Sequence, residues 1–235
     1  MDPFLLLDKA AAQGFISPAV AKRVRSKSKT LQGAVKRVER AANLRYPPYY
    51  IEPSLPVAAT SMEYGSVGAL YARIIPATIE GRLSILVQFT APLLLFGLKG
   101  TLEAVAAHEF THYVDLVRRF SRMQVTSDES VNTLFEAEYA DEGRVADPSR
   151  VFLNDRPLAS LVKRKFKAGL VDEKLNEKVV RGWIEKALPT KRVSTEENTV
   201  RVGVGSIAQA SFDPMLLMRI EELEKASKPG VARHD

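Results

Sequence analysis

The sequence contains no cysteine, and this absence excludes a disulfide framework, a cysteine-based metal site and a thiol nucleophile. It also lacks an apolar run close to the roughly 20 residues of a membrane-spanning helix. The apolar run near the start covers only residues 4–7 and follows the acidic Asp2, which is unlike a secretory signal. We therefore expect a cytoplasmic protein with no membrane partner.

Apolar residues make up 46% of the 235 residues, which is enough for a sizeable hydrophobic core. The formal net charge is +6, and many cations lie near the N-terminus, namely Lys22, Arg23, Arg25, Lys27, Lys29, Lys36, Arg37 and Arg40. Such a run is typical either of a solvated helix surface or of a nucleic-acid contact. A solvated surface is the simpler interpretation, because no interleaved aromatic residues and no nucleic-acid motif accompany the run.

Helix-starting and helix-breaking residues divide the chain into three regions. Residues 1–57 are predicted to be a basic helical extension with a proline-rich linker, because Ser17-Pro18 begins a helix and four prolines lie within residues 46–57. Residues 58–150 form a central core. Residues 151–235 are predicted to be mainly helical and to end in a loose tail.

The central core combines strand and helix patterns, which predicts an α+β fold. Two β-rich runs, over residues 69–75 and 83–90, predict a hairpin that turns near Glu80-Gly81. One helix is predicted from Thr101, as its N-cap, to about residue 119. A second helix is predicted over residues 127–147, because a proline follows that range.

Residues 108–112 read His-Glu-Phe-Thr-His in the middle of the first predicted helix. Histidines four residues apart lie on one side of a helix, so His108 and His112 can bind the same metal ion. Glu109 is the predicted general base, which activates a metal-bound water for attack on a peptide carbonyl and passes the proton to the leaving amine. Chance spacing is a weak alternative, since two of the chain's three histidines occur here. The motif predicts a catalytic zinc site.

A catalytic zinc ion usually takes a third ligand from the protein. The only other histidine is His234 in the tail, so this ligand is expected to be a carboxylate on the helix predicted over residues 127–147. That helix carries the glutamates Glu129, Glu136, Glu138 and Glu142. Glu138 and Glu142 fall within its apolar stripe, where a carboxylate is costly unless it is paired or bound to metal. We predict Glu138 as the ligand and Glu142 as the partner of a ligand imidazole, with Glu136 as the alternative ligand.

The five-residue motif followed by an acid-rich helix resembles the gluzincin metallopeptidases, the thermolysin-like clan that includes the small minigluzincins. The resemblance covers roughly residues 66–147, and Glu142 stands where the family usually has an aspartate. It implies that residues 58–150 are a zincin-like catalytic core, with a small mixed or antiparallel sheet over an active-site helix and a glutamate helix. Helices from both ends of the chain would flank this core. The resemblance also implies that Leu83–Thr90 is the edge strand that binds an extended substrate.

The leading hypothesis is therefore a zinc-dependent metallopeptidase of the HExxH type, an endopeptidase acting on peptides or unfolded protein. The second hypothesis is a nucleic-acid-associated protein that binds DNA or RNA through its basic N-terminal helices. In that protein the metal centre acts on bound proteins or serves a structural role. The intact Glu109 argues against a non-catalytic metalloprotein.

Overall fold

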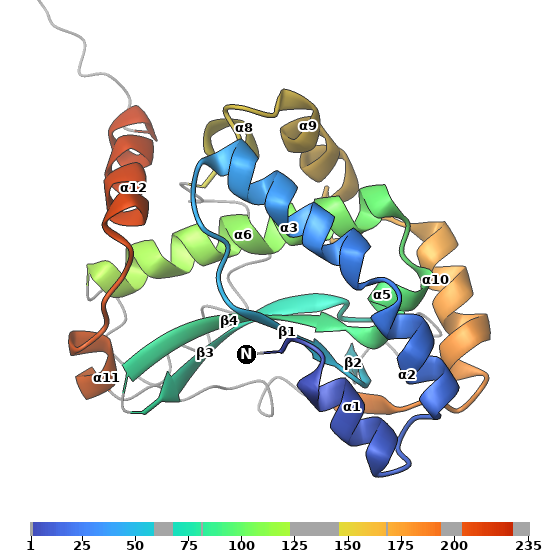
Figure 1. Ribbon diagram of the computed structural model, residues 1–235. Helices are drawn as coiled ribbons and strands as arrows, with labels where there is room; N and C mark the ends of the chain where they lie inside the picture. Colours follow the sequence, from blue (N-terminus) through green and yellow to red (C-terminus); the bar gives the residue numbers. More distant parts are fainter. Residues whose placement is uncertain are drawn as a thin grey trace, which may run out of the picture.

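The computed structural model describes residues 2–58, 68–80, 82–122, 146–167, 169–193 and 204–227. Their helices are α1 (Leu5–Ala12), α2 (Pro18–Arg25), α3 (Ser28–Ala42), α5 (Ala91–Phe96), α6 (Lys99–Ser121), α8 (Pro148–Val151), α9 (Arg156–Lys165), α10 (Glu173–Val179), the π-helix η2 (Val180–Ile184), α11 (Val204–Ala208) and α12 (Pro214–Ser227). Their strands are β1 (Tyr49–Glu52), β2 (Leu55–Ala58), β3 (Ala72–Ile79), β4 (Arg82–Thr90) and β5 (Thr190–Val193). The fold is α+β, as predicted, and α6 crosses one face of the sheet formed by β1, β3 and β4 (Figure 1).

Local backbone signals mark the bounds of the N-terminal helices, and the helical structure breaks between α2 and α3 at residues 26–27. The Val20 N–H donates a hydrogen bond to Ser17 Oγ at 3.3 Å, so α2 starts at Pro18 as expected. Gly14, with a φ of +77°, provides the left-handed turn between α1 and α2. Asn43 ends α3 in the same left-handed region, with a φ of 54°.

β3 and β4 form the predicted hairpin. Their antiparallel register runs from Ala72↔Phe89 to Ile79↔Arg82, and the turn passes through Glu80 at a φ of 51°. Alternate residues of β4 point into the core, and this buried set consists of Leu83, Ile85, Val87 and Phe89. Gln88 and Thr90 are buried as well, so the end of β4 that pairs with β1 is covered on both faces.

β4 is the central strand of a sheet with the order β1-β4-β3, so the expectation that Leu83–Thr90 is an edge strand is wrong. Its second neighbour is β1, which pairs with it in parallel from Tyr49↔Val87 to Glu52↔Thr90. The proline-rich segment supplies this strand because Pro48 and Pro53 stand on either side of the four paired residues. Neither proline removes a hydrogen-bond donor from the ladder.

A second, two-stranded sheet joins segments that are far apart in the sequence. β2 pairs in parallel with β5, from Leu55↔Thr190 to Ala58↔Val193. The Pro189 carbonyl, immediately before β5, accepts hydrogen bonds from the Leu55 N–H and from the Trp183 indole N–H, both at 2.9 Å. Because Trp183 is fully buried, this carbonyl connects the small sheet to the core.

α6 begins at Lys99, two residues earlier than predicted, and the prediction that Thr101 is its N-cap is wrong. Leu98 occupies the N-cap position without a side-chain hydrogen bond. The Thr101 hydroxyl instead donates to the Asp172 carboxylate at 2.6 Å. A hydrogen bond to a charged acceptor is stronger than a neutral capping bond, so tertiary contact overrides the local signal.

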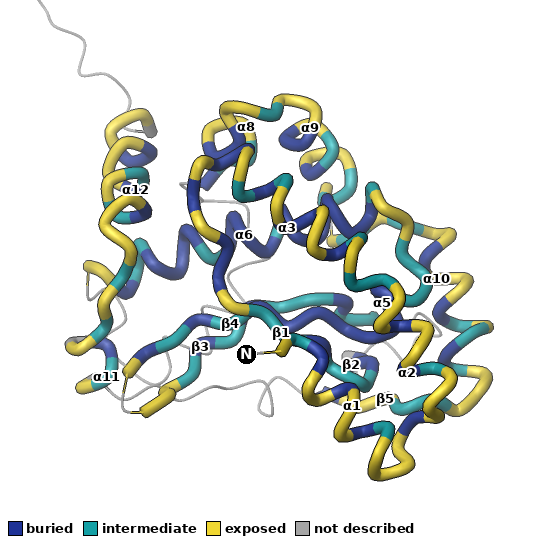
Figure 2. The backbone as a smooth tube through the Cα atoms, in the orientation of Figure 1, coloured by how far each residue is buried: buried dark blue, intermediate teal, exposed yellow. Residues whose placement is uncertain are grey.

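All three regions of the chain contribute to one hydrophobic core. Val38 of α3, Phe110 of α6, Trp183 of η2 and Leu216 of α12 are each at most 2% exposed. Figure 2 shows that α6 is buried along most of its length. None of the described helices is long and apolar enough to cross a membrane.

An ionic cluster also ties α3 to the core. The Arg37 guanidinium lies 2.6 Å from the Glu103 carboxylate of α6 and 2.7 Å from that of Asp155, which caps α9. The hydrogen bonds from Arg37 lower the pKa of Asp155 despite partial burial of this carboxyl. One arginine thus holds together three helices around the N-terminal half of α6.

Two glycines within the helical segments differ in the space around them. A Cβ added at Gly182 would lie 2.5 Å from the Phe96 ring of α5, whereas one added at Gly33 meets nothing within 4 Å. We expect Gly182→Ala to lower the free energy of unfolding by about 1–3 kcal/mol, because Phe96 must move. Gly33→Ala should raise it by about 0.5–1 kcal/mol, since alanine is the better helix former. Denaturant unfolding measures both variants, and shifts of the same sign would contradict the packing at Gly182.

Candidate metal centre

The His-Glu-Phe-Thr-His motif lies in the middle of α6, as predicted. The preceding segment, 102–107, contains three alanines and a leucine, which favour the helix. Glu109 is 6% exposed and His112 is 8% exposed, while His108 is half-buried. Phe110 packs against Tyr46 in the core, with ring centroids 5.7 Å apart. Helical geometry therefore directs the two histidines away from that contact, on the same side of α6.

The two imidazoles converge. Their Nε2 atoms lie 2.8 Å apart and their ring planes are almost perpendicular, at 89°. A tetrahedral zinc ion with Zn–N distances of about 2.0–2.1 Å places two ligand nitrogens about 3.4 Å apart. His108 and His112 fit such an ion after a shift of roughly half an ångström, which small side-chain rotations supply.

Phe166 covers one face of the His108 ring. The two rings are nearly parallel, at 8°, and their centroids are 3.7 Å apart. Phe166 follows directly after α9, and its N–H donates to the Val162 carbonyl at 2.9 Å, which ends that helix. Sequence reasoning missed this residue, because nothing in the local pattern of α9 indicates that its end lies against α6.

The Glu109 carboxylate affects the electrostatics on the core side of the motif. Burial raises the pKa of the Tyr46 hydroxyl well above its usual range, and the charge of Glu109 raises it further. This hydroxyl donates to the Ala106 carbonyl at 2.9 Å. Burial also raises the pKa of Tyr113 to about 12, and its ring lies 5.8 Å from Phe110. Both phenols therefore stay protonated at neutral pH.

The glutamates proposed as metal ligands, Glu136 and Glu138, and their neighbours Glu129 and Glu142, lie outside the described residues. Within the described ranges no group of three or more histidine, cysteine, aspartate or glutamate side chains is placed to hold a metal ion. The described part of the site therefore consists of two converging imidazoles and the neighbouring Glu109. The third ligand stays a prediction from the sequence.

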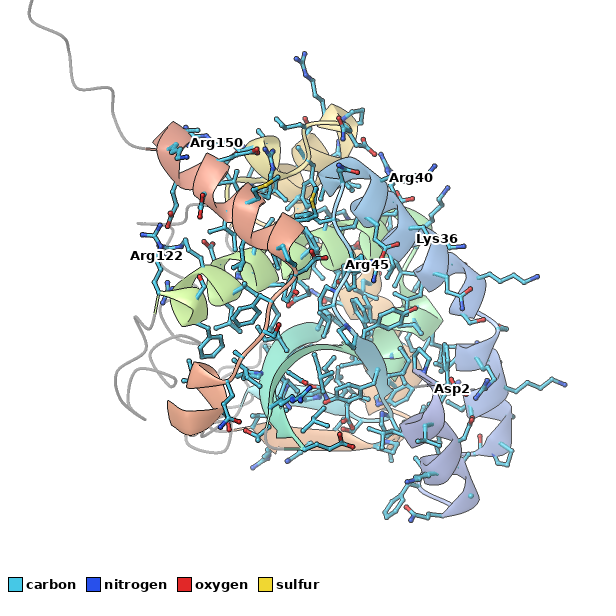
Figure 3. All side chains as sticks on the ribbon, turned by 60° about the vertical axis from the view of Figure 1, so that its left-hand side comes forward. Asp2, Lys36, Arg40, Arg45, Arg122 and Arg150 are labelled. Carbon is cyan, nitrogen blue, oxygen red and sulfur yellow. The ribbon has the colours of Figure 1, made fainter. Side chains whose placement is uncertain are left out.

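Ion pairs tie the C-terminal end of α6 to α12. The Arg118 guanidinium lies 3.6 Å from Asp115 and 3.8 Å from Glu224 of α12, and Arg122 pairs with the same glutamate. Figure 3 shows Arg122 at this end of α6, close to α12. The ion pairs with Glu224 hold α12 against α6, the helix that carries the motif. Asp115, which takes part in the same cluster, comes three residues after His112.

Two imidazole nitrogens and the buried Glu109 carboxylate lie together in the motif on α6. Imidazole nitrogen suits zinc and several other transition metals, and a carboxylate beside it can accept a proton. Groups of these kinds take part in metal-assisted hydrolysis. Comparisons with protein-family models, with curated proteins and with solved structures found no match to this chain.

Proposed function

We propose that the protein is a zinc-dependent metallopeptidase with a zincin-like core similar to that of the gluzincins. The observation that carries this proposal is the convergence of the His108 and His112 Nε2 atoms, 2.8 Å apart, on a helix that also holds the buried Glu109. The position of α6 across one face of a mixed sheet supports the zincin-like core (Figure 1).

Each of these residues has a defined role in the proposal. His108 and His112 would hold the zinc ion together with Glu138, or with Glu136 in its place. When bound, zinc lowers the pKa of water and polarises a carbonyl group. Glu109 accepts a proton from the attacking water and delivers it to the leaving nitrogen, because an amine leaves only in its protonated form. Glu142 would accept a hydrogen bond from a ligand imidazole and fix its orientation.

The proposed substrate is a peptide or an unfolded protein segment, bound in extended form at a sheet edge. β1 occupies one side of β4 along Val87–Thr90, and β3 occupies the other side. The Ile51 N–H of β1 already donates to the Pro3 carbonyl at 2.9 Å, so an extended substrate would pair with the outer side of β3.

Metal analysis combined with digestion of a peptide library tests the proposed function directly. The purified chain is expected to carry one zinc ion and to cleave internal peptide bonds, and removal of the metal by a chelator should abolish cleavage until zinc is restored. A chain that takes up no zinc and leaves every peptide intact would refute the proposal.

Nucleic-acid binding is a second candidate function, favoured by the outer surface of α3. Lys29, Lys36 and Arg40 are exposed there, and Figure 3 shows Lys36 and Arg40 on the outside of the helix. The one acidic residue of α3, Glu39, is half-buried and accepts a hydrogen bond from the Tyr46 N–H. The exposed surface of α3 is therefore basic without a compensating acid.

Two other cations of the N-terminal run are engaged elsewhere. Arg25 pairs with Asp2 and Asp8, and Arg37 belongs to the ionic cluster with Glu103. Lys22 and Arg23 of α2 are exposed as well, so the basic surface includes α2 as well as α3. Of the six other cations of the run, Lys29, Lys36 and Arg40 are the ones exposed on α3.

Salt-dependent binding of an arbitrary DNA duplex tests the second candidate. If α3 docks on phosphates, replacing Lys29, Lys36 and Arg40 together with glutamine should reduce the slope of log K against log salt by about 2.7, since each phosphate contact contributes about 0.9. The matched control replaces Lys174, Lys178 and Arg181 of α10 and η2, which are also exposed. Equal slopes for the two triple variants would exclude α3 as the docking surface.

A further inference from the structure

His108 needs more support than His112 to serve as a metal ligand. His112 is 8% exposed, so its neighbours restrict its ring, whereas His108 is half-buried. A half-buried imidazole can turn about χ2, and each turn moves Nε2 away from the partner nitrogen. The group that restrains His108 therefore affects how well the pair is preorganised.

Phe166 provides this restraint. Its ring lies parallel to the imidazole at a centroid distance of 3.7 Å, so it blocks rotation of His108 toward that side. A face-to-face contact does not involve the edge of the imidazole, which carries both ring nitrogens. The contact thus limits the orientation of His108 without covering Nε2.

Asp172 holds Phe166 in position through a set of hydrogen bonds that we name the Asp172 clasp. Its Oδ2 atom accepts from Thr101 Oγ1 at 2.6 Å and from Lys165 Nζ at 2.7 Å, and its Oδ1 atom accepts from the Leu175 N–H at 3.1 Å. The Val171 N–H also donates to the Lys165 carbonyl at 2.8 Å. The clasp therefore closes the loop that begins with Phe166.

The Asp172 clasp also fixes this loop to α6. Thr101 comes seven residues before His108, which is about two helical turns. One carboxylate thus joins the end of α9, the start of α10 and the helix that carries both histidines. The ring of Phe166 is held over His108 by contacts on the same helix as the motif.

We propose that Phe166 is a positioning residue that raises zinc affinity by fixing the orientation of the His108 imidazole. This inference rests on the proposed function, since it requires that His108 bind zinc. Residues that orient a metal ligand typically change metal affinity by tenfold or more. Phe166 acts by ring contact, so the effect belongs at the lower end of that range.

Competition with a chromophoric chelator measures the zinc affinity of the full chain and of three variants. Phe166→Leu keeps the apolar bulk but loses the flat ring, and we expect about tenfold weaker zinc binding. Phe166→Tyr keeps the ring and should stay within about twofold of the wild type. Phe15→Leu is the matched control, because Phe15 is 68% exposed and far along the chain from the motif.

Two further measurements separate positioning from general packing. The Co²⁺ absorption spectrum should change in Phe166→Leu and be restored in Phe166→Tyr, because it reports ligand geometry. Asp172→Asn weakens the clasp without altering either ring, and it should also weaken zinc binding. This variant replaces Phe166→Leu as the test if Phe166→Leu fails to fold. Circular dichroism of the metal-free variants identifies such a failure.

The outcomes distinguish this inference from the proposed function. If the wild type binds no zinc, the proposed function and the inference both fail. If the wild type binds zinc and folded Phe166→Leu binds it equally well, only the positioning role is overturned. Equal losses in Phe166→Leu and Phe166→Tyr would also overturn it, since the flat ring would then not be the cause.

Discussion

Glu109→Gln is expected to lower peptidase turnover by about 10²–10⁴-fold while the zinc content stays unchanged. Glutamine has the size and shape of glutamate but cannot take up a proton, so the variant removes the proposed general base alone. Glu109 is only 6% exposed, and an isosteric amide avoids leaving a cavity at this position. The measurement is the initial rate of cleavage of a peptide substrate found in the library digest, with zinc determined in the same samples.

Glu177→Gln is the matched control for this experiment, because Glu177 is exposed on α10 and makes the same charge change. It should cleave at the wild-type rate. A Glu109→Gln protein that retains full turnover would show that another group moves the proton. Loss of zinc together with turnover would instead show that Glu109 supports metal binding.

The second large effect is the loss of zinc affinity when either histidine of the motif is removed. His108→Ala and His112→Ala are each expected to weaken zinc binding by about 100- to 1,000-fold. Binding of a four-ligand structural zinc is worth about 10–16 kcal/mol, which corresponds to about 2.5–4 kcal/mol per ligand. About 1.4 kcal/mol changes an equilibrium constant tenfold, so the loss of one ligand reduces affinity by two to three orders of magnitude.

Competition with a chelator of known affinity measures this loss, and the third histidine of the chain provides the control. His234→Ala should bind zinc as tightly as the wild type. If His234→Ala and His112→Ala weaken binding equally, the motif is not the metal site. If neither motif variant changes the affinity, zinc binds elsewhere on the chain.

Local features of the sequence predict the elements that hold the motif. Alanine-rich helix-forming residues before His108 predict the middle of α6, and the four-residue spacing predicts that the two imidazoles share one side. The two β-rich runs on either side of Glu80-Gly81 predict the hairpin of β3 and β4. These predictions succeed because each signal lies within one element and its immediate turn.

Predictions that depended on distant contacts were less accurate. Thr101 looks like an N-cap, but Asp172 takes its hydroxyl, and this aspartate comes from the start of α10. The four prolines within residues 46–57 led to the prediction of a linker, so β1 was missed. Pro48 and Pro53 flank the paired residues and do not interrupt them. Phe166 carried no local signal at all, since its role depends on where α9 packs.

The parallel pairing of β2 with β5 has a consequence for how the chain folds. Leu55 finds its strand partner only after Thr190 has been synthesised, so the small sheet can form only late in synthesis. Contacts between such distant segments slow folding, because a long loop must close first. The single tryptophan, Trp183, is bonded to the Pro189 carbonyl beside β5, and its fluorescence therefore reports this late step.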